Sequence, residues 1–277
     1  MTVALTFVSW LDLLTSLLLA GGTLFAVLIA VPSPLGTRVL RWSAAILGIV
    51  LLVDFALVAL RIHWVTAIAG VALLHDLLAL WWTRLWFLRV GGLAVLAALL
   101  GTARPNWRVA AAIASLWLLA RSFQGHAGAH GTLPALIDWV HLLTAATWLG
   151  SLTQFALLSS HSPLTATRLR RLATVSVILL VPAGIYAAFL HMRNLHQLLY
   201  SPYGRTLLAK IGLVLVLIAV GATNHFVHVP AVIGGEREAG RRLHRAAVLE
   251  LALGAAVLLL SALLGVLPMP HVMPIDP

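Results

Sequence analysis

Three histidines and an aspartate lie close together in the stretch SFQGHAGAHGTLPALIDWVHLL, residues 122–143. His126 and His130 are four positions apart in a glycine-rich segment, and Asp138 and His141 follow at helical spacing. Residues three or four positions apart share one face of a helix. Because imidazole and carboxylate groups bind metal ions, and imidazole also ligates haem iron, the stretch predicts a metal or haem site.

A second candidate ligand set stands in the segment PMPHVMP, where Met269, His271 and Met273 alternate. In an extended backbone, alternate side chains point to the same side. Thioether and imidazole are soft, neutral ligands that suit copper, above all Cu(I), and the chain has no cysteine. The other interpretation is a proline-broken tail without a function.

The composition places these ligands in a membrane protein. Hydrophobic residues make up 61% of the chain and charged residues 9%, whereas a soluble domain has about 25% charged residues. Lys and Arg together number 18, against 8 for Asp and Glu. In a membrane protein such an excess contacts anionic lipid and sets the orientation, so we expect the lipid bilayer as a partner and no nucleic acid. The sequence shows no ATP-binding motif, and we expect no enzymatic activity.

Eight apolar runs are long enough to span a bilayer as helices, for which about 17 to 25 residues are needed. Backbone inside a bilayer must satisfy its own hydrogen bonds, so we predict an all-α integral membrane protein with eight transmembrane helices. The runs are residues 3–31, 39–60, 85–101, 108–124, 133–159, 172–190, 207–226 and 246–266.

Eight spans put both termini on one side of the membrane. Of the 18 basic residues, eleven fall in or beside the loops near residues 35, 105, 165 and 235. The positive-inside rule then predicts that these loops are cytoplasmic and that both termini lie outside.

The chain also contains an internal duplication. LHDLLALWWTRLWFLRVGGL, from Leu74, aligns without a gap with LHQLLYSPYGRTLLAKIGLV, from Leu195, and the upstream WLDLLT matches WVHLLT. We predict two parallel four-helix repeats, residues 1–124 and 133–277, the second ending in the Met/His tail, with a site between them. The two matched segments predict short interfacial helices on the outer face.

The duplication puts Asp12 at the position of His141. Ionisable side chains inside a membrane are costly unless they face the interior of the bundle. We therefore predict that Asp12 and His141 line a polar pocket between the repeats. The other interpretation of His141 is a hydrogen-bonded packing residue.

Further ionisable residues lie within the predicted spans. Arg89 and Lys210, which are equivalent in the duplication, stand near the ends of their spans, and we expect them to extend toward the lipid headgroups. Asp54 adds another acid to the outer half of the bundle. Glu250 enters the last span, and we expect it to pair with a loop arginine.

Four motifs in order resemble one family. GHA, DWVHLLTAATWLG, SPYGRTLLAKIGLVLVLIAVGATNH and RRLHRAAVLELALGA, within residues 122–265, are similar to the copper-resistance protein D (CopD) family of bacterial inner-membrane proteins. The resemblance implies an eight-span protein that handles copper at or across that membrane, often beside a periplasmic copper-binding partner of the copper-resistance C type. No soluble copper-binding domain is fused to the chain, so that partner would be either separate or absent. The positions carried over are His126, His141, Trp148, Tyr203, Gly204, Lys210 and Glu250, of which only the histidines are plausible ligands.

We therefore expect the protein to accept copper, as Cu(I) or Cu(II), from the periplasmic side and to transport it across the inner membrane. The expected path has three parts: collection by Met269, His271 and Met273, transfer by His130 and His126, and binding by His141 with Asp12 or Asp138.

Two other functions stay open. Four-helix units with inward histidines hold haem in membrane redox proteins of the haem A synthase type, although only His141 is clearly buried in this sequence. The protein could also be a membrane partner that docks a periplasmic copper carrier while no ion crosses.

Overall fold

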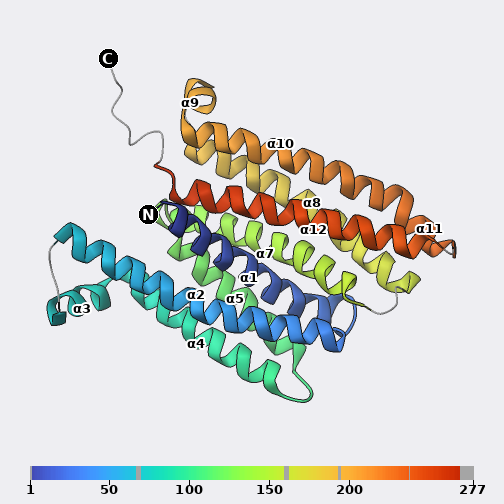
Figure 1. Ribbon diagram of the computed structural model, residues 1–277, viewed down its shortest axis with the longest axis horizontal. Helices are drawn as coiled ribbons and strands as arrows, with labels where there is room; N and C mark the ends of the chain where they lie inside the picture. Colours follow the sequence, from blue (N-terminus) through green and yellow to red (C-terminus); the bar gives the residue numbers. More distant parts are fainter. Residues whose placement is uncertain (1, 67–69, 159–161, 193–194, 237, 269–277) are drawn as a thin grey trace.

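The computed structural model describes residues 2–66, 70–158, 162–192, 195–236 and 238–268, and all regular structure in them is helical (Figure 1). A π-helical stretch, η1 (Asn224–His228), follows α10. The α-helices are α1 (Thr2–Leu28), α2 (Pro34–Thr66), α3 (Gly70–Ala79), α4 (Trp81–Gly101), α5 (Trp107–Gln124), α6 (His126–Ala129), α7 (Thr132–Ala156), α8 (Pro163–His191), α9 (Leu195–Tyr200), α10 (Pro202–Thr223), α11 (Val229–Ile233) and α12 (Ala239–Val266).

Seven helices in the described part of the chain are long and apolar enough to cross a membrane. They are α1, α2, α4, α7, α8, α10 with its continuation to Ile233, and α12. The predicted all-α membrane protein is thus confirmed. The remaining predicted span, α5, has 18 residues with Arg108 and Arg121 near its two ends, and it lies against α1, α4 and α7. The count of eight spans stays a prediction, as does the division into repeats 1–124 and 133–277.

The helix α1 is central in the bundle. It lies against α2 and α5 on one side and against α7 and α12 on the other, as Figure 1 shows. A Cβ atom on Gly21 would overlap the backbone of Ala146, and one on Gly150 would overlap that of Gly21. Small residues of this kind let helices approach closely inside a membrane. The pair of α1 and α7 therefore joins the two predicted repeats.

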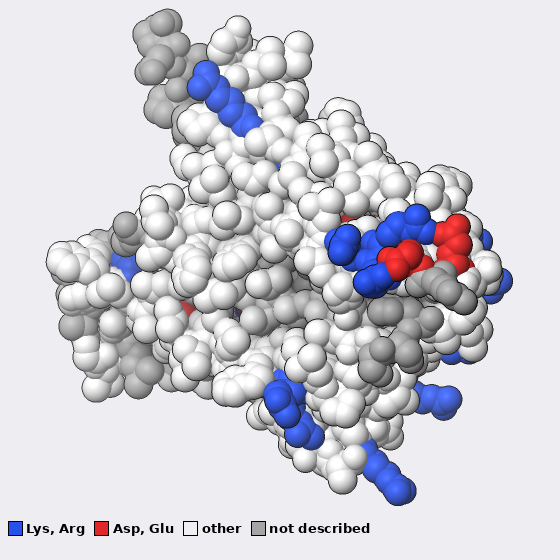
Figure 2. All heavy atoms as spheres, turned by 45° about the vertical axis from the view of Figure 1, so that its right-hand side comes forward, with Lys and Arg blue, Asp and Glu red and all other residues white. Residues whose placement is uncertain are grey.

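The bundle has two ends. We call one the arginine-rich end: it carries the loops between α1 and α2, α4 and α5, and α11 and α12, and there Arg241 pairs with Glu238 and Arg242 with Glu236. Most of the charged side chains in view in Figure 2 lie at one end of a largely uncharged surface. The terminal end holds the start of α1, the end of α12 and the short helices α3, α6 and α9 (Figure 1). That α3 and α9 lie at the membrane surface stays a prediction.

Candidate functional site

Asp12 is the centre of a charged cluster in the first half of the chain. Its Oδ1 lies 2.5 Å from Nη2 of Arg89 on α4, and its Oδ2 lies 2.9 Å from Nε of Arg121 on α5. Arg89 also donates from Nη1 to Oε1 of Gln124 at 2.7 Å, and its guanidinium carbon lies 4.3 Å from the ring centre of Trp117. Both carboxylate oxygens of Asp12 are therefore bound to guanidinium groups.

This cluster corrects the expectation that Arg89 extends to the lipid headgroups. Its side chain is 3% exposed and is held inside the bundle. The physical reason is that a buried carboxylate and a buried guanidinium compensate each other, whereas each alone would be costly. Asp54 on α2 belongs to the same group, since the charges of Asp12, Arg89 and Arg121 act on its carboxyl. The two guanidinium groups compensate the charge of Asp12 and oppose a metal cation at this carboxylate.

His141 lies on α7 with its ring against α8. Its Cε1 is 3.6 Å from the place that a Cβ atom on Gly184 would occupy, and the ring forms a hydrogen bond with the backbone of Leu180. Among the described atoms, its Nδ1 is buried and has no hydrogen-bond partner. Buried polar atoms are nearly always paired, so an unpaired one needs an explanation. An unprotonated ring nitrogen in this state can bind a metal ion.

Two charged residues, Lys210 and Asp138, lie near His141. Lys210 on α10 acts electrostatically on the imidazole, and Asp138, one turn before His141 on α7, acts on Lys210. In the predicted duplication Lys210 is equivalent to Arg89, and His141 to Asp12. In each predicted repeat, these two equivalent positions place a basic side chain near a titratable one: Arg89 near Asp12, and Lys210 near His141. The neighbours of Asp12 come from α4 and α5, whereas those of His141 come from α8 and α10.

His126 and His130 lie at the two ends of α6, at the terminal end of the bundle, and both are exposed. Nε2 of His126 donates to the carbonyl oxygen of Gly265 in the last turn of α12, at 2.8 Å. That bond leaves Nδ1 as the ring nitrogen with a lone pair. The chain therefore leaves α12 beside His126. The predicted ligands Met269, His271 and Met273 lie outside the described residues.

Within the described ranges, no group of three or more His, Asp or Glu side chains is close enough to hold a metal ion. His126, His130, His141 and Asp138 are therefore not gathered around one centre. His126 and His130 lie at the terminal end, whereas Asp138 and His141 lie on α7 in the second half of the bundle.

Glu250 on α12 is 4% exposed, and its carboxylate accepts a hydrogen bond from Nδ2 of Asn224 in the π-helical stretch. The expectation that it pairs with a loop arginine is wrong. Two arginines near the start of α12, Arg241 and Arg242, bind exposed glutamates instead. A polar amide on the neighbouring helix satisfies the buried carboxylate without bringing a second charge into the bundle.

The SPYGR motif has a structural role in the described contacts. Ser201 caps α10 by accepting from the backbone N–H of Gly204 at 2.9 Å, and Tyr203 is buried. A Cβ atom on Gly204 would overlap the backbone of Leu198, so α9 folds tightly back onto α10. Trp148 on α7 is half-buried.

Three polar residues of these clusters were not predicted as site residues. Arg121 and Gln124 complete the cluster around Asp12, and Asn224 binds Glu250. The available signal was their presence in otherwise apolar runs, because polar groups inside a membrane face partners.

These features define an all-helical membrane-spanning protein with ionisable groups buried between its helices. Residues 163–264, from α8 to α12, match the sequence model of the family described as copper resistance protein D. The predicted resemblance to the CopD family is therefore confirmed for this C-terminal part of the chain.

One curated relative extends the similarity. The copper transport protein CutJ of Bacillus subtilis (strain 168) is 32% identical over an alignment 166 residues long, which covers 55% of this chain and 29% of that protein. The chain thus spans less than a third of the length of this relative. No solved structure matches the chain.

Proposed function

We propose that the protein binds copper in the second half of its bundle and transports it across the bacterial inner membrane, accepting it from the periplasmic side. The observation that carries the proposal is the buried, unpaired Nδ1 of His141. Its ring rests on α8, the first helix of the stretch that matches the copper resistance family. The similarity to a protein named for copper transport supports copper as the cargo.

The proposed path begins at the terminal end of the bundle. His126 and His130 are exposed there, and the chain leading to Met269, His271 and Met273 starts beside His126. Copper exchanges readily between neighbouring imidazole and thioether ligands because both are soft and neutral. We propose that the tail collects the ion and that the two exposed histidines pass it inward.

We assign the inner part of the path to His141 and Asp138 on α7. Asp12 is left out because Arg89 and Arg121 already compensate its charge and would repel a metal cation. Lys210 opposes a metal cation beside His141 by like-charge repulsion. The positive charge of Lys210 therefore weakens copper binding at His141.

The proposed orientation places the arginine-rich end in the cytoplasm and both termini in the periplasm. It is supported by the excess of basic residues in the loops at that end, with α5 counted as an eighth span. A separate periplasmic copper-binding protein of the copper-resistance C type would deliver the ion, and no enzymatic step is needed.

The test is copper binding by the full chain in lipid nanodiscs, measured as bound Cu(I) per protein in competition with a chromophoric chelator. We expect the H126A/H141A double variant to lose the bound ion. The H225A/H228A double variant, changed at the arginine-rich end, is the matched control and should bind as the unmodified protein does. Unchanged binding in H126A/H141A would overturn the site, and proteoliposomes that bind but do not take up copper would favour a docking role.

A further inference from the structure

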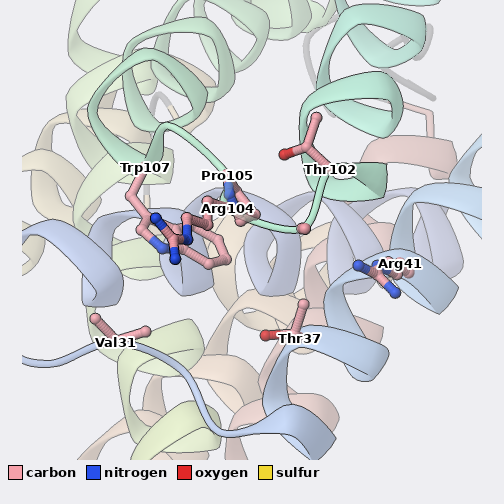
Figure 3. Close-up of a pocket in the computed structure, with 8 residues that line it drawn as sticks. Val31, Thr37, Arg41, Thr102, Arg104, Pro105 and Trp107 are labelled. Carbon is pink, nitrogen blue, oxygen red and sulfur yellow. The ribbon is translucent and has the colours of Figure 1, made fainter.

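A cavity of about 290 Å³ opens at the arginine-rich end, at the other end of the bundle from His126 and His130. It lies between the loop that joins α1 to α2 and the loop that joins α4 to α5 (Figure 3). Its lining consists of Val31, Thr37, Arg41, Thr102, Ala103, Arg104, Pro105 and Trp107.

The polar groups of this lining are suited to an anion. Arg41 and Arg104 bring two guanidinium groups, and none of the eight lining residues is acidic. In Figure 3, Thr37 and Thr102 lie on opposite sides of the space, with Trp107 and Arg41 at its two ends. The hydroxyl of Thr37 and the indole N–H of Trp107 supply further hydrogen-bond donors, whereas the hydroxyl of Thr102 already donates to the carbonyl oxygen of Leu99. Guanidinium groups bind phosphate oxygens with two parallel hydrogen bonds, so a phosphate group fits this chemistry best.

Arg41 is held in place by the fold. Its Nε donates to the carbonyl oxygen of Leu100 in the last turn of α4, at 2.8 Å. This bond ties α2 to α4 at the rim of the cavity and fixes the plane of the guanidinium group. The two terminal nitrogens of an arginine remain as donors once Nε is used. The cavity is therefore preorganised by a contact between two membrane-spanning helices.

An apolar stripe on α2 begins beside the cavity. Trp42, Ile46 and Ile49 follow at helical spacing on one face, and they are 65%, 38% and 63% exposed. Within a membrane-spanning helix, such a stripe faces lipid chains. A ligand with a phosphate group in the cavity and acyl chains along this stripe would use both features. Basic pockets between transmembrane helices at a cytoplasmic surface are known sites for anionic lipid headgroups.

We propose that this cavity binds the phosphate group of an anionic membrane lipid. Arg41 and Arg104 hold the phosphate oxygens, and the acyl chains lie along Trp42, Ile46 and Ile49. The site then fixes α2, α4 and α5 against the leaflet at the arginine-rich end. The site uses none of the residues of the proposed copper path, so the lipid proposal can be tested independently of that path.

The experiment is native mass spectrometry of the full chain with phosphatidylglycerol or phosphatidylcholine added at equal concentration. We expect the unmodified protein to retain phosphatidylglycerol, and the R41Q/R104Q variant to retain about tenfold less, as the loss of charge-assisted hydrogen bonds predicts. The control is R38Q/R108Q, which removes two exposed arginines at the same end that do not line the cavity. It should retain the lipid.

Three outcomes would overturn the proposal. The first is equal retention of the two lipids by the unmodified protein, and the second is an equal loss of phosphatidylglycerol in the two double variants. The third is thermal stabilisation by inorganic phosphate without any stabilisation by phosphatidylglycerol, which would mean a soluble ligand. If R41Q/R104Q does not fold, R104Q alone replaces it, because that change leaves the bond from Arg41 to Leu100 intact.

Discussion

Arg89 and Asp12, 77 residues apart in the chain, form an ion pair of 2.5 Å between α4 and α1. With Arg121 the pair joins three helices of the first predicted repeat. At the equivalent positions of the second repeat stand Lys210 and His141. In the first half, ion pairs satisfy the buried carboxylate, whereas in the second half Nδ1 of His141 has no hydrogen-bond partner among the described residues.

Replacing Asp12 by Ala is expected to destabilise the protein by about 3 to 5 kcal/mol, because two buried guanidinium groups lose their partner. The measurement is thermal or denaturant unfolding of the protein in detergent, followed by circular dichroism. D76A, at a half-exposed acid on α3, is the control and should change stability little. Copper stoichiometry of the folded D12A fraction should equal that of the unmodified protein; loss of copper at unchanged stability would mean that Asp12 is a ligand.

The spans were predictable from hydropathy because a membrane demands long apolar runs. The ends of the helices were less predictable. The helix α2 continues to Thr66, beyond the expected residue 60, because helical hydrogen bonding continues into less apolar sequence. The expected span 108–124 matches the helix α5 closely.

The polar contacts were only partly predictable. The duplication identified Arg89 and Lys210 as equivalent. It did not show that Arg89 turns inward to Asp12, because the partner stands 77 residues away and is brought near only by packing. Likewise, Glu250 on α12 accepts a hydrogen bond from the side-chain amide of Asn224 and does not pair with an arginine, because packing brings that amide next to its carboxylate. Hydropathy and spacing indicate which residues need partners, and the tertiary fold decides which partners they receive.

Replacing Gly21 by Ala is expected to destabilise the bundle by about 1 to 3 kcal/mol, as overpacking does. The added methyl group would overlap the backbone of Ala146, which cannot move without separating α1 from α7. G91A is the matched control, since a Cβ atom there meets no other atom within 4 Å. Unfolding in detergent measures both variants, and equal midpoints would contradict the close contact between α1 and α7.

Replacing Asn224 by Ala is expected to cost about 1 to 3 kcal/mol, because Glu250 would keep a buried carboxyl without its donor. The double variant N224A/E250L removes both polar groups and should recover much of the loss. A double-variant cycle on unfolding free energies measures the coupling. If N224A and E250L add independently, the hydrogen bond contributes nothing.

The metal content and visible spectrum of the purified protein distinguish copper from haem. We expect copper by elemental analysis and no Soret band, because His126 and His130 are exposed at the terminal end and His141 lies inside the bundle against α8. A haem iron bound by two imidazoles would need two histidines at one depth on facing helices. A Soret band that disappears in H141A would therefore replace the copper proposal with the haem-binding one.

Replacing Lys210 by Met is expected to raise the copper affinity of the site around His141. The positive charge of Lys210 acts on that imidazole, and a metal cation bound there would meet the same repulsion. At an effective dielectric constant near 20, removing one charge several ångströms away is worth on the order of 1 to 2 kcal/mol, or about tenfold in affinity. Methionine keeps the length of the side chain and most of its packing volume.

The variant K210R is the control, because it keeps the positive charge and should leave the copper affinity near that of the unmodified protein. Chelator competition in nanodiscs measures all three proteins. A fall in affinity with K210M would mean that the lysine supports the site, by holding Asp138 in place, and does not oppose the ion.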